Sequence, residues 1–238
     1  MRLDKYLADC GAGSRSEIKK LIRGGCVKVL GTEKIKADTQ LDETAAKVYL
    51  NGRELVYRRY IYLMLNKPQG YVSATWDSRL PVVLDLVPEE FLHFKPFPAG
   101  RLDIDTEGLC LITNDGALAH KITSPAHHIP KTYTAVVDKE ISQDDIDAFK
   151  DGIVLDDGYR TKPAVLKLTE DGDACKAEVI ITEGKFHQIK RMFEALDKKV
   201  LYLKRTAMNR LVLDESLKTG EIRELAAEEI ELLEKGDR

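Results

Sequence analysis

Cysteine is scarce in this 238-residue chain, and its spacing argues against two common kinds of stabilising site. The four cysteines, Cys10, Cys26, Cys110 and Cys175, lie far apart without a CxxC pair, and the five histidines form no HExxH motif. Disulfide frameworks and zinc sites both need closer, recurring spacings. We therefore predict reduced cysteines that pack as small apolar residues, and no metal site.

Long apolar runs are also missing. No stretch reaches the ~18 consecutive apolar residues of a membrane-spanning helix, and the first residues, MRLDKYLADCG, carry charges where an export signal would be apolar. Hydrophobic residues make up 43% and charged residues 32% of the chain, as in ordinary soluble proteins. We expect a soluble cytoplasmic protein with no membrane partner.

The formal net charge of -3 shows no overall excess of cations, but the charge is unevenly distributed. Residues 1–60 hold 13 Lys and Arg against 8 Asp and Glu, whereas residues 214–238 hold 4 against 9. Local rather than net charge sets the attraction to phosphate. The N-terminal segment is therefore the candidate for binding a polyanion, although a solvated surface could carry the same excess.

A short amphipathic helix is predicted within this basic segment. Ser14 and Glu17 fit a capping box, and Gly24 and Gly25 end the helical pattern. Its apolar positions are Ile18, Leu21 and Ile22, and its other side carries Arg15, Lys19, Lys20 and Arg23. A purely cationic stripe favours a role facing phosphate, because a merely solvated helix usually mixes Glu with Lys.

Three short strands are predicted after this helix, in CVKVLG, KADTQL and KVYLNGREL, with a tight turn at Asn51-Gly52. Together with RLDKYLA and SRSEIKKLIRGGCV, these blocks resemble the S4 RNA-binding domain, except that Leu30 stands where that family commonly has Asn. The resemblance implies an RNA-binding domain over residues 1–59. It implies RNA contacts from Arg2, Lys5, Arg15, Lys19, Lys20, Arg23 and Lys28.

A larger domain is expected over residues 60–238. Strand patterns such as IYLMLNKPQGYV, LCLIT, TYTAVVD, AVLKLT, AEVIIT and VLYLKR are interrupted by helical ones such as SQDDIDAFKDG, FHQIKRMFEAL and AAEEIELL. Strands and helices do not alternate regularly, which argues against a doubly wound parallel sheet. We predict an α+β fold: a small N-terminal α/β module, then a larger domain on a mostly antiparallel mixed sheet flanked by helices.

Two common kinds of enzyme site find no support. GAGSRS, residues 11–16, lacks the third Gly and the Lys of a phosphate-binding loop, so no nucleotide cofactor is expected. The chain also has no GxSxG motif, so a serine hydrolase has no positive support.

The densest group of polar residues lies in PAGRLDIDTEGLCLITNDG, residues 98–116, where Arg101, Asp103, Asp105, Thr106 and Glu107 precede an apolar strand. From composition alone, Asp103 or Asp105 is a turn former that caps its own backbone.

GRLDIDTEGLCLITNDG resembles the catalytic loop of pseudouridine synthases of the ribosomal small-subunit type. LNKPQGYV (65–72), ITSPAHHIPKTYTAV (122–136) and EGKFHQIKRMFEALDKKV (183–200) match that family in the same order. The resemblance implies that Asp103 is the nucleophile, that Tyr133 stacks on the target base, and that Lys190 is the basic partner of the carboxylate. Without it, Tyr133 is a half-buried strand aromatic and Lys190 an exposed helix cation.

The implied reaction turns a uridine into pseudouridine by moving the uracil from N1 to C5 attachment, so it needs no cofactor and no metal. The nucleotide must leave its stack, which costs a few kcal/mol, and phosphate contacts must offset this cost. In the catalytic domain the candidates for these contacts are Arg101, Lys131, His187 and Arg191.

Within the family, SPAHHIPKTY and MLNKPQGYV are more similar to the enzyme acting on 16S ribosomal RNA than to those acting on 23S. We expect 16S RNA, or a small-subunit assembly intermediate, as the partner of a monomeric isomerase. A 23S enzyme is the first alternative, and a non-catalytic S4-type RNA-binding or ribosome-assembly factor is the second.

Overall fold

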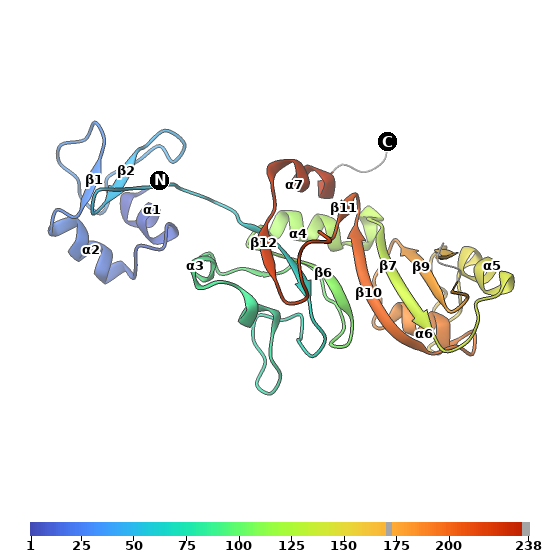
Figure 1. The fold of residues 1–238 in the computed structure, drawn as a ribbon. Coiled ribbons are helices and arrows are strands. Elements are labelled where there is room, and N and C mark those ends of the chain that lie inside the picture. The colour runs from blue at the N-terminus through green and yellow to red at the C-terminus, as the bar shows by residue number, and fades with distance from the viewer. Residues whose placement is uncertain (170–172, 235–238) are drawn as a thin grey trace. The chain divides into compact units, whose positions relative to one another are not determined.

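The computed structural model describes residues 1–169 and 173–234 and divides into two compact units (Figure 1). Unit 1 holds Met1–Ile61 and Pro88–Lys95, and unit 2 holds Tyr62–Val87 and the described residues from Pro96 onward. In the part of the chain that is described, no helix is both long and apolar enough to cross a membrane. Each unit is considered by itself.

Unit 1 is a small module of helices and a three-stranded antiparallel sheet in the order β1-β2-β3. Its core holds Leu3, Tyr6 and Leu7 from the first helix against Ile18 and Val48, all at 0–1% exposure. Its elements are α1 (Leu3–Asp9), α2 (Arg15–Arg23), β1 (Val27–Val29), β2 (Val48–Leu50), β3 (Arg53–Leu55) and α3 (Glu89–Leu92).

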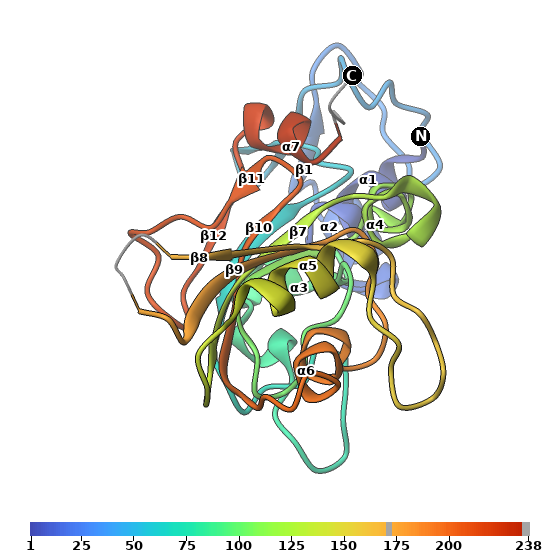
Figure 2. The ribbon, with the colours of Figure 1, turned by 90° about the vertical axis from the view of Figure 1, so that its right-hand side faces the viewer.

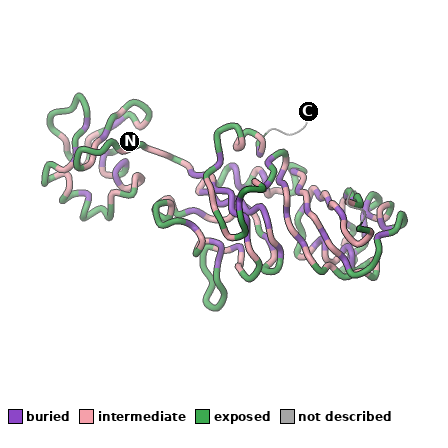
Figure 3. The backbone as a smooth tube through the Cα atoms, in the orientation of Figure 1, coloured by how far each residue is buried: buried purple, intermediate pink, exposed green. Residues whose placement is uncertain are grey.

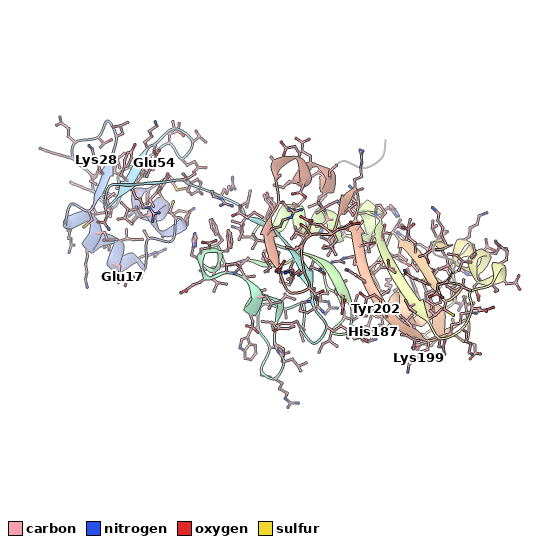
Figure 4. The ribbon with its side chains drawn as sticks, viewed as in Figure 1. Glu17, Lys28, Glu54, His187, Lys199 and Tyr202 are labelled. Carbon is pink, nitrogen blue, oxygen red and sulfur yellow. The ribbon has the colours of Figure 1, made fainter. Side chains whose placement is uncertain are left out.

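Helix α2 begins and ends where the sequence predicted. The Ser14 backbone N–H donates to Glu17 Oε2 at 2.7 Å, and Ser14 Oγ accepts from the Glu17 N–H at 3.4 Å, which confirms the capping box. Ile18 is fully buried, whereas Arg15, Lys19, Lys20 and Arg23 are exposed. The helix therefore packs its apolar side into the core and exposes its cations to solvent on the other side. Glu17 and Lys28 are labelled in Figure 4.

The predicted turn at Asn51-Gly52 is confirmed, and the predicted strand over residues 36–41 is wrong. Asn51 and Gly52 both have positive φ, 51° and 81°, as a two-residue hairpin requires, and they join β2 to β3. In residues 36–41 only Gln40 forms a single bridge, to Arg2. The carbonyls of Ala37 and Thr39 instead accept the first free amides of α1, which a helix start must satisfy.

Unit 2 is built on a nine-stranded sheet in the order β12-β4-β6-β10-β7-β9-β8, with β5 paired to β6 and β11 to β10. Among the paired strands of the described residues, β10 and β6 alone run parallel, so the sheet is mixed and mostly antiparallel, as predicted. Its strands are β4 (Tyr62–Lys67), β5 (Phe97–Pro98), β6 (Glu107–Thr113), β7 (Lys131–Val137), β8 (Val165–Leu168), β9 (Lys176–Ile181), β10 (Val200–Met208), β11 (Leu211–Val212) and β12 (Ile222–Glu224).

Helices cover this sheet on both faces (Figure 2). Leu118 of α4 and Leu233 of α7 share a core with Leu109 and Leu111 of β6, while Phe149 of α5 meets Phe193 of α6 at 5.0 Å between ring centroids. The helical elements are η1 (Val83–Leu86), α4 (Gly116–Thr123), η2 (Pro125–His127), α5 (Gln143–Asp151), α6 (Gln188–Glu194) and α7 (Ala227–Glu234). Buried residues concentrate in the sheet (Figure 3). The mixed sheet together with these helices confirms the α+β prediction for unit 2.

Gly108 lies where three strands meet, just after the loop that contains Asp103 and Asp105. It pairs with Lys67 of β4 and with Arg205 of β10, and its φ is +99°. A Cβ at this position would clash with the backbone carbonyl of Arg205. Only glycine therefore lets β10 approach β6 this closely.

Gly108→Ala is expected to lower the free energy of unfolding of unit 2 by at least about 2 kcal/mol, through strain at positive φ and the clash with β10. Urea unfolding followed by the fluorescence of Trp76, the chain's single Trp, reports on unit 2. Gly116→Ala is the control, since its Cβ would meet nothing within 4 Å. Equal stability of the two variants would contradict this account of the junction.

Candidate active site

The loop before β6, residues 99–106, is here termed the Asp103 loop. The buried ammonium of Lys67 holds it through hydrogen bonds to backbone carbonyls. Lys67 Nζ donates to the backbone carbonyls of Pro68 at 3.0 Å, Asp103 at 3.1 Å, Ile104 at 3.3 Å and Thr106 at 2.9 Å. Three of these four acceptors belong to the loop. One side chain thus fixes the backbone at Asp103 and over the residues that follow it.

A second set of contacts holds the same loop from its flank. Ser73 Oγ donates to the Leu102 carbonyl at 2.9 Å and accepts from the Leu102 N–H at 3.0 Å, and the Gly70 N–H donates to the Ile104 carbonyl at 2.8 Å. Backbone groups that would otherwise be free are therefore satisfied. These contacts tie the backbone of Leu102 and Ile104 to the segment that contains Gly70 and Ser73.

Burial makes Lys67 an unusual lysine. Its side chain has no exposed surface, and burial lowers its pKa to about 8, while the charges of Asp105, Asp103 and Glu107 oppose the fall. The hydrogen bonds to carbonyls compensate for part of the hydration that the ammonium loses.

The carboxylate of Asp103 faces two basic side chains, one from within α6 and one from the residue that precedes α6. Lys190 Nζ lies 3.3 Å from Asp103 Oδ2, and His187 Nε2 lies 3.7 Å from Asp103 Oδ1. The Asp103 side chain remains 26% exposed. A ligand can therefore reach the carboxylate while its charge is balanced.

Lys190 also binds Asp105, a contact that sequence reasoning missed. Its Nζ lies 2.5 Å from Asp105 Oδ1, closer than it lies to Asp103. Partial burial alone would raise the pKa of Asp105, but the hydrogen bond and charge of Lys190 together lower it. The ammonium therefore bridges the two carboxylates and fixes the exposed side of the loop.

Asp103 opens onto a cavity of about 460 Å³ with Tyr133 in its wall. Tyr133 is 7% exposed and lies on β7 between Val179 of β9 and Arg205 of β10. Cavities of this size hold small organic ligands. An aromatic wall beside a carboxylate suits a planar ring bound next to the reacting group.

An aromatic pair lies at the edge of the same cavity. The rings of Phe186 and His187 stack with centroids 3.8 Å apart and an interplanar angle of 17°, and Phe186 is 69% exposed. His187 precedes α6 with φ at 49°, a conformation that non-glycine residues rarely adopt. Figure 4 labels His187.

Three of the four phosphate-contact candidates in unit 2, Arg101, Lys131 and His187, line this cavity. The fourth, Arg191, is engaged elsewhere: its Nε lies 2.7 Å from Asp156 Oδ1 and its guanidinium 2.7 Å from Asp157 Oδ2.

The candidates in unit 1 are surface residues of that unit. Arg2 forms a hydrogen-bonded ion pair with Asp4 at 2.8 Å. The four cations of α2 are exposed together with Lys5 on α1 and Lys28 on β1.

Sequence reasoning missed Lys67 and Phe186, although both lie in blocks that carried the family resemblance. The signal for Lys67 was a lysine at the end of a strand of apolar residues, a place where an unpaired charge is costly. Phe186 gave no such signal, because an aromatic residue before a helix usually packs inward.

The arrangement can hold an ionised carboxylate beside a bound planar ring, because one ammonium fixes its backbone and another neutralises its charge. In the described residues, no group of three or more His, Cys, Asp and Glu is placed to hold a metal ion. The fold and the geometry together define a candidate enzyme site with a carboxylate positioned beside a cavity.

Comparisons with known proteins identify the family. The RNA pseudouridylate synthase family model matches residues 61–195, and the S4 domain model matches residues 1–32. An uncharacterized RNA pseudouridine synthase of Bacillus subtilis is 47% identical, with 98% of each chain covered. Ribosomal small subunit pseudouridine synthase A of Haemophilus influenzae is 40% identical, covering 99% of this chain and 100% of its own.

A solved structure agrees with these matches. The crystal structure of a pseudouridylate synthase superposes with a TM-score of 0.69 at 38% identity, covering 98% of this chain and 99% of the other. The chain therefore belongs to the RNA pseudouridylate synthase family, and it is an isomerase acting on RNA with an N-terminal S4 domain.

The pKa of Lys67 predicts a pH dependence of stability. The folded-state pKa of about 8 lies below the ordinary 10.5, so between these values the unfolded chain binds the proton more strongly. As the pH is raised from about 8 to 10.5, the free energy of unfolding should therefore increase, by up to about 3 kcal/mol from this residue. Below pH 8 both states hold the proton and the contribution is constant.

Lys67→Met supplies the comparison, because it removes this titration and leaves the other buried lysines in place. Urea unfolding from pH 7 to 10.5 should show the wild-type chain gaining stability relative to the variant. A constant difference across that range would mean that the Lys67 amine is in contact with water.

Proposed function

We propose that the chain is a ribosomal RNA pseudouridine synthase that isomerises a uridine of 16S RNA, with Asp103 as its nucleophile. The observation that carries this proposal is the contact of Lys190 with Asp103 at 3.3 Å, at a small pocket of about 80 Å³ that both residues line together with Tyr133. Family membership supplies the reaction, and this geometry supports the roles of the three residues.

The reaction breaks the C1′–N1 glycosidic bond, turns the uracil, and forms a C1′–C5 bond. The hydrogen on C5 leaves to solvent and N1 gains a proton, so substrate and product have the same composition. Asp103 acts by attack on the target nucleoside, at C6 of the base or C1′ of the ribose, or by assisting elimination to a glycal. In each route the carboxylate must be ionised and placed against the sugar or base.

Lys190 keeps the carboxylate ionised when RNA covers the cavity. An Asp in water is already an anion near pH 7, but exclusion of water favours the neutral acid. A cation at 3.3 Å opposes that change. Tyr133 stacks against the target base, a contact usually worth about 1–3 kcal/mol.

Binding must offset the cost of removing the uridine from its stack, which is a few kcal/mol. Arg101, Lys131 and His187 hold RNA at the cavity, and Arg191 contributes by exchanging its aspartate partners for phosphate. The cations of α2, with Arg2, Lys5 and Lys28, bind RNA farther from the target and set its register. The division into an RNA-binding domain, residues 1–59, and a catalytic domain, residues 60–238, is part of this proposal.

The small ribosomal subunit is favoured as the source of the substrate by the name of the Haemophilus influenzae relative, which covers the whole chain. The motifs SPAHHIPKTY and MLNKPQGYV support the same choice. We propose that the chain acts as a cytoplasmic monomer on 16S RNA or on a partly assembled small subunit. A 23S target is the second candidate, and the α2 cations alone would also suit a non-catalytic assembly factor.

Asp103→Asn is expected to reduce tritium release from [5-³H]uridine-labelled 16S RNA by more than about a thousandfold, because an amide cannot act as the nucleophile. RNA affinity should change little, since Asn has nearly the same shape and Asp103 carries no contact needed to hold the strand. Filter binding and single-turnover release measure the two effects separately.

Asp147→Asn is the matched control, since Asp147 is exposed on α5 and does not line the cavity. It should release tritium like the wild-type chain. Full activity of the Asp103 variant would remove Asp103 from the reaction.

Reversing the charges of Arg15, Lys19 and Arg23 to Glu is expected to weaken RNA binding and to flatten its salt dependence. Each lost phosphate contact should reduce the slope of log affinity against log salt by roughly 0.7–0.9, because fewer counterions are displaced. Reversing Lys150, Lys167 and Lys218, which are exposed in unit 2, changes net charge equally. A slope that the α2 variant leaves unchanged would place α2 outside the interface.

A further inference from the structure

Two buried cations line the cavity, and neither belongs to an ion pair among the described residues. Arg205 on β10 is 2% exposed and Lys131 on β7 is 8% exposed, and both line the cavity with Tyr133. The strand register places Arg205 opposite Tyr133, and alternate residues of β7 put Lys131 and Tyr133 on the same face of the sheet. The two positive charges therefore share one side of the cavity.

Neither cation is neutralised by the protein. Lys131 Nζ donates to the carbonyl of Ile129 at 2.9 Å, and Arg205 Nε donates to the carbonyl of Leu109 at 2.7 Å. Arg205 Nη2 is buried and has no hydrogen-bond partner. Among the described ion pairs, none includes Arg205 or Lys131, and the nearby carboxylates of Asp103 and Asp105 are engaged by Lys190.

This arrangement is costly in the free protein. Two like charges repel, and burial of an unpaired cation carries a large desolvation penalty. The pKa of Lys131 falls to about 8, first because of burial and then because of the charge of Arg205. A bound anion would relieve both costs and would give Arg205 Nη2 an acceptor.

We propose that Arg205 and Lys131 form an anion subsite that binds a phosphate group of the nucleotide held in the cavity. The inference rests on the proposed function, since it takes the occupant of the cavity to be a uridine nucleotide of RNA. A uracil carbonyl could accept a hydrogen bond from Arg205, but it would leave both charges unbalanced. A phosphate supplies the acceptors and the negative charge together.

The subsite separates two tasks within one cavity. Lys190 balances Asp103, while Arg205 and Lys131 bind the backbone of the same nucleotide. Arg205 lies opposite Tyr133 in the strand pairing. The sugar and phosphate of a nucleotide whose base stacks on Tyr133 would therefore lie along the cavity wall that holds Arg205. The subsite thereby anchors the nucleotide outside its stack.

The first experiment compares uridine with uridine 5′-monophosphate and uridine 3′-monophosphate as ligands of the full chain, by NMR titration. One monophosphate should bind the wild-type chain at least about tenfold more tightly than uridine, as expected for charge-assisted hydrogen bonds. In Lys131→Gln this advantage should fall below about threefold, because Gln retains a donor for Ile129 and loses the charge.

Two further variants keep the interpretation clear. Arg205→Lys retains a buried cation and should preserve part of the advantage, which shows that charge is the property required. Lys199→Gln removes an exposed lysine outside the cavity, labelled in Figure 4, and should preserve all of it.

The second experiment uses RNA whose phosphate next to the modified uridine is replaced by a neutral methylphosphonate. The replacement should raise the KM of the wild-type chain by about tenfold, whereas in Lys131→Gln it should add less than about threefold. This non-additivity measures the contact between the phosphate and the Lys131 ammonium. A purely structural role of Lys131 would give additive effects instead.

Equal affinity of the wild-type chain for uridine and both monophosphates would overturn the subsite. An equal loss of uridine and monophosphate binding in Lys131→Gln would also overturn it, because the lysine would then support the cavity or the base. The nucleotide titration needs no turnover. Its result is therefore separate from that of the Asp103→Asn assay, which tests the proposed function.

Discussion

The buried ammonium of Lys67 is the constraint on which the site depends. A loop of eight residues between two strands has many accessible conformations, and the carbonyls of Asp103, Ile104 and Thr106 converge on one cation only in the observed one. That convergence compensates for burying the charge, and it fixes the backbone from which Asp103 projects. Gly108 then lets β10 approach the end of the loop, which places Tyr133 and Arg205 beside it.

The charged groups at and near the cavity are of two kinds: carboxylates that contact a lysine, and buried cations that take part in no described ion pair. The carboxylates of Asp103 and Asp105 share the ammonium of Lys190, so each has a cationic partner in the free protein. Arg205 and Lys131 take part in no ion pair among the described residues, and we propose that they pair with an anion of the ligand. Such a cavity favours a phosphate-bearing ligand over a neutral one, because only the former pairs every buried charge. In the proposed roles, phosphate binding and the balancing of Asp103 are therefore assigned to different cations.

The sequence predicted most elements, because hydrophobic periodicity and turn residues act locally: the Ser14 capping box and the Asn51-Gly52 turn are examples. It failed at residues 36–41, where the backbone satisfies the start of α1 instead of a sheet, a choice made by tertiary contacts. The resemblance pointed to Asp103, Tyr133 and Lys190, which together line a small pocket of about 80 Å³. Lys67 was missed because its partners are backbone carbonyls, which have no sequence signature. Arg205 was missed because it lies in an ordinary strand pattern.

The most direct test of the account is a map of pseudouridines in ribosomal RNA from cells lacking this gene, complemented with either the wild-type chain or Asp103→Asn. The account predicts that one 16S position remains uridine without the gene, and that only the wild-type chain restores pseudouridine there. An unchanged map, or restoration by the Asp103 variant, would contradict it.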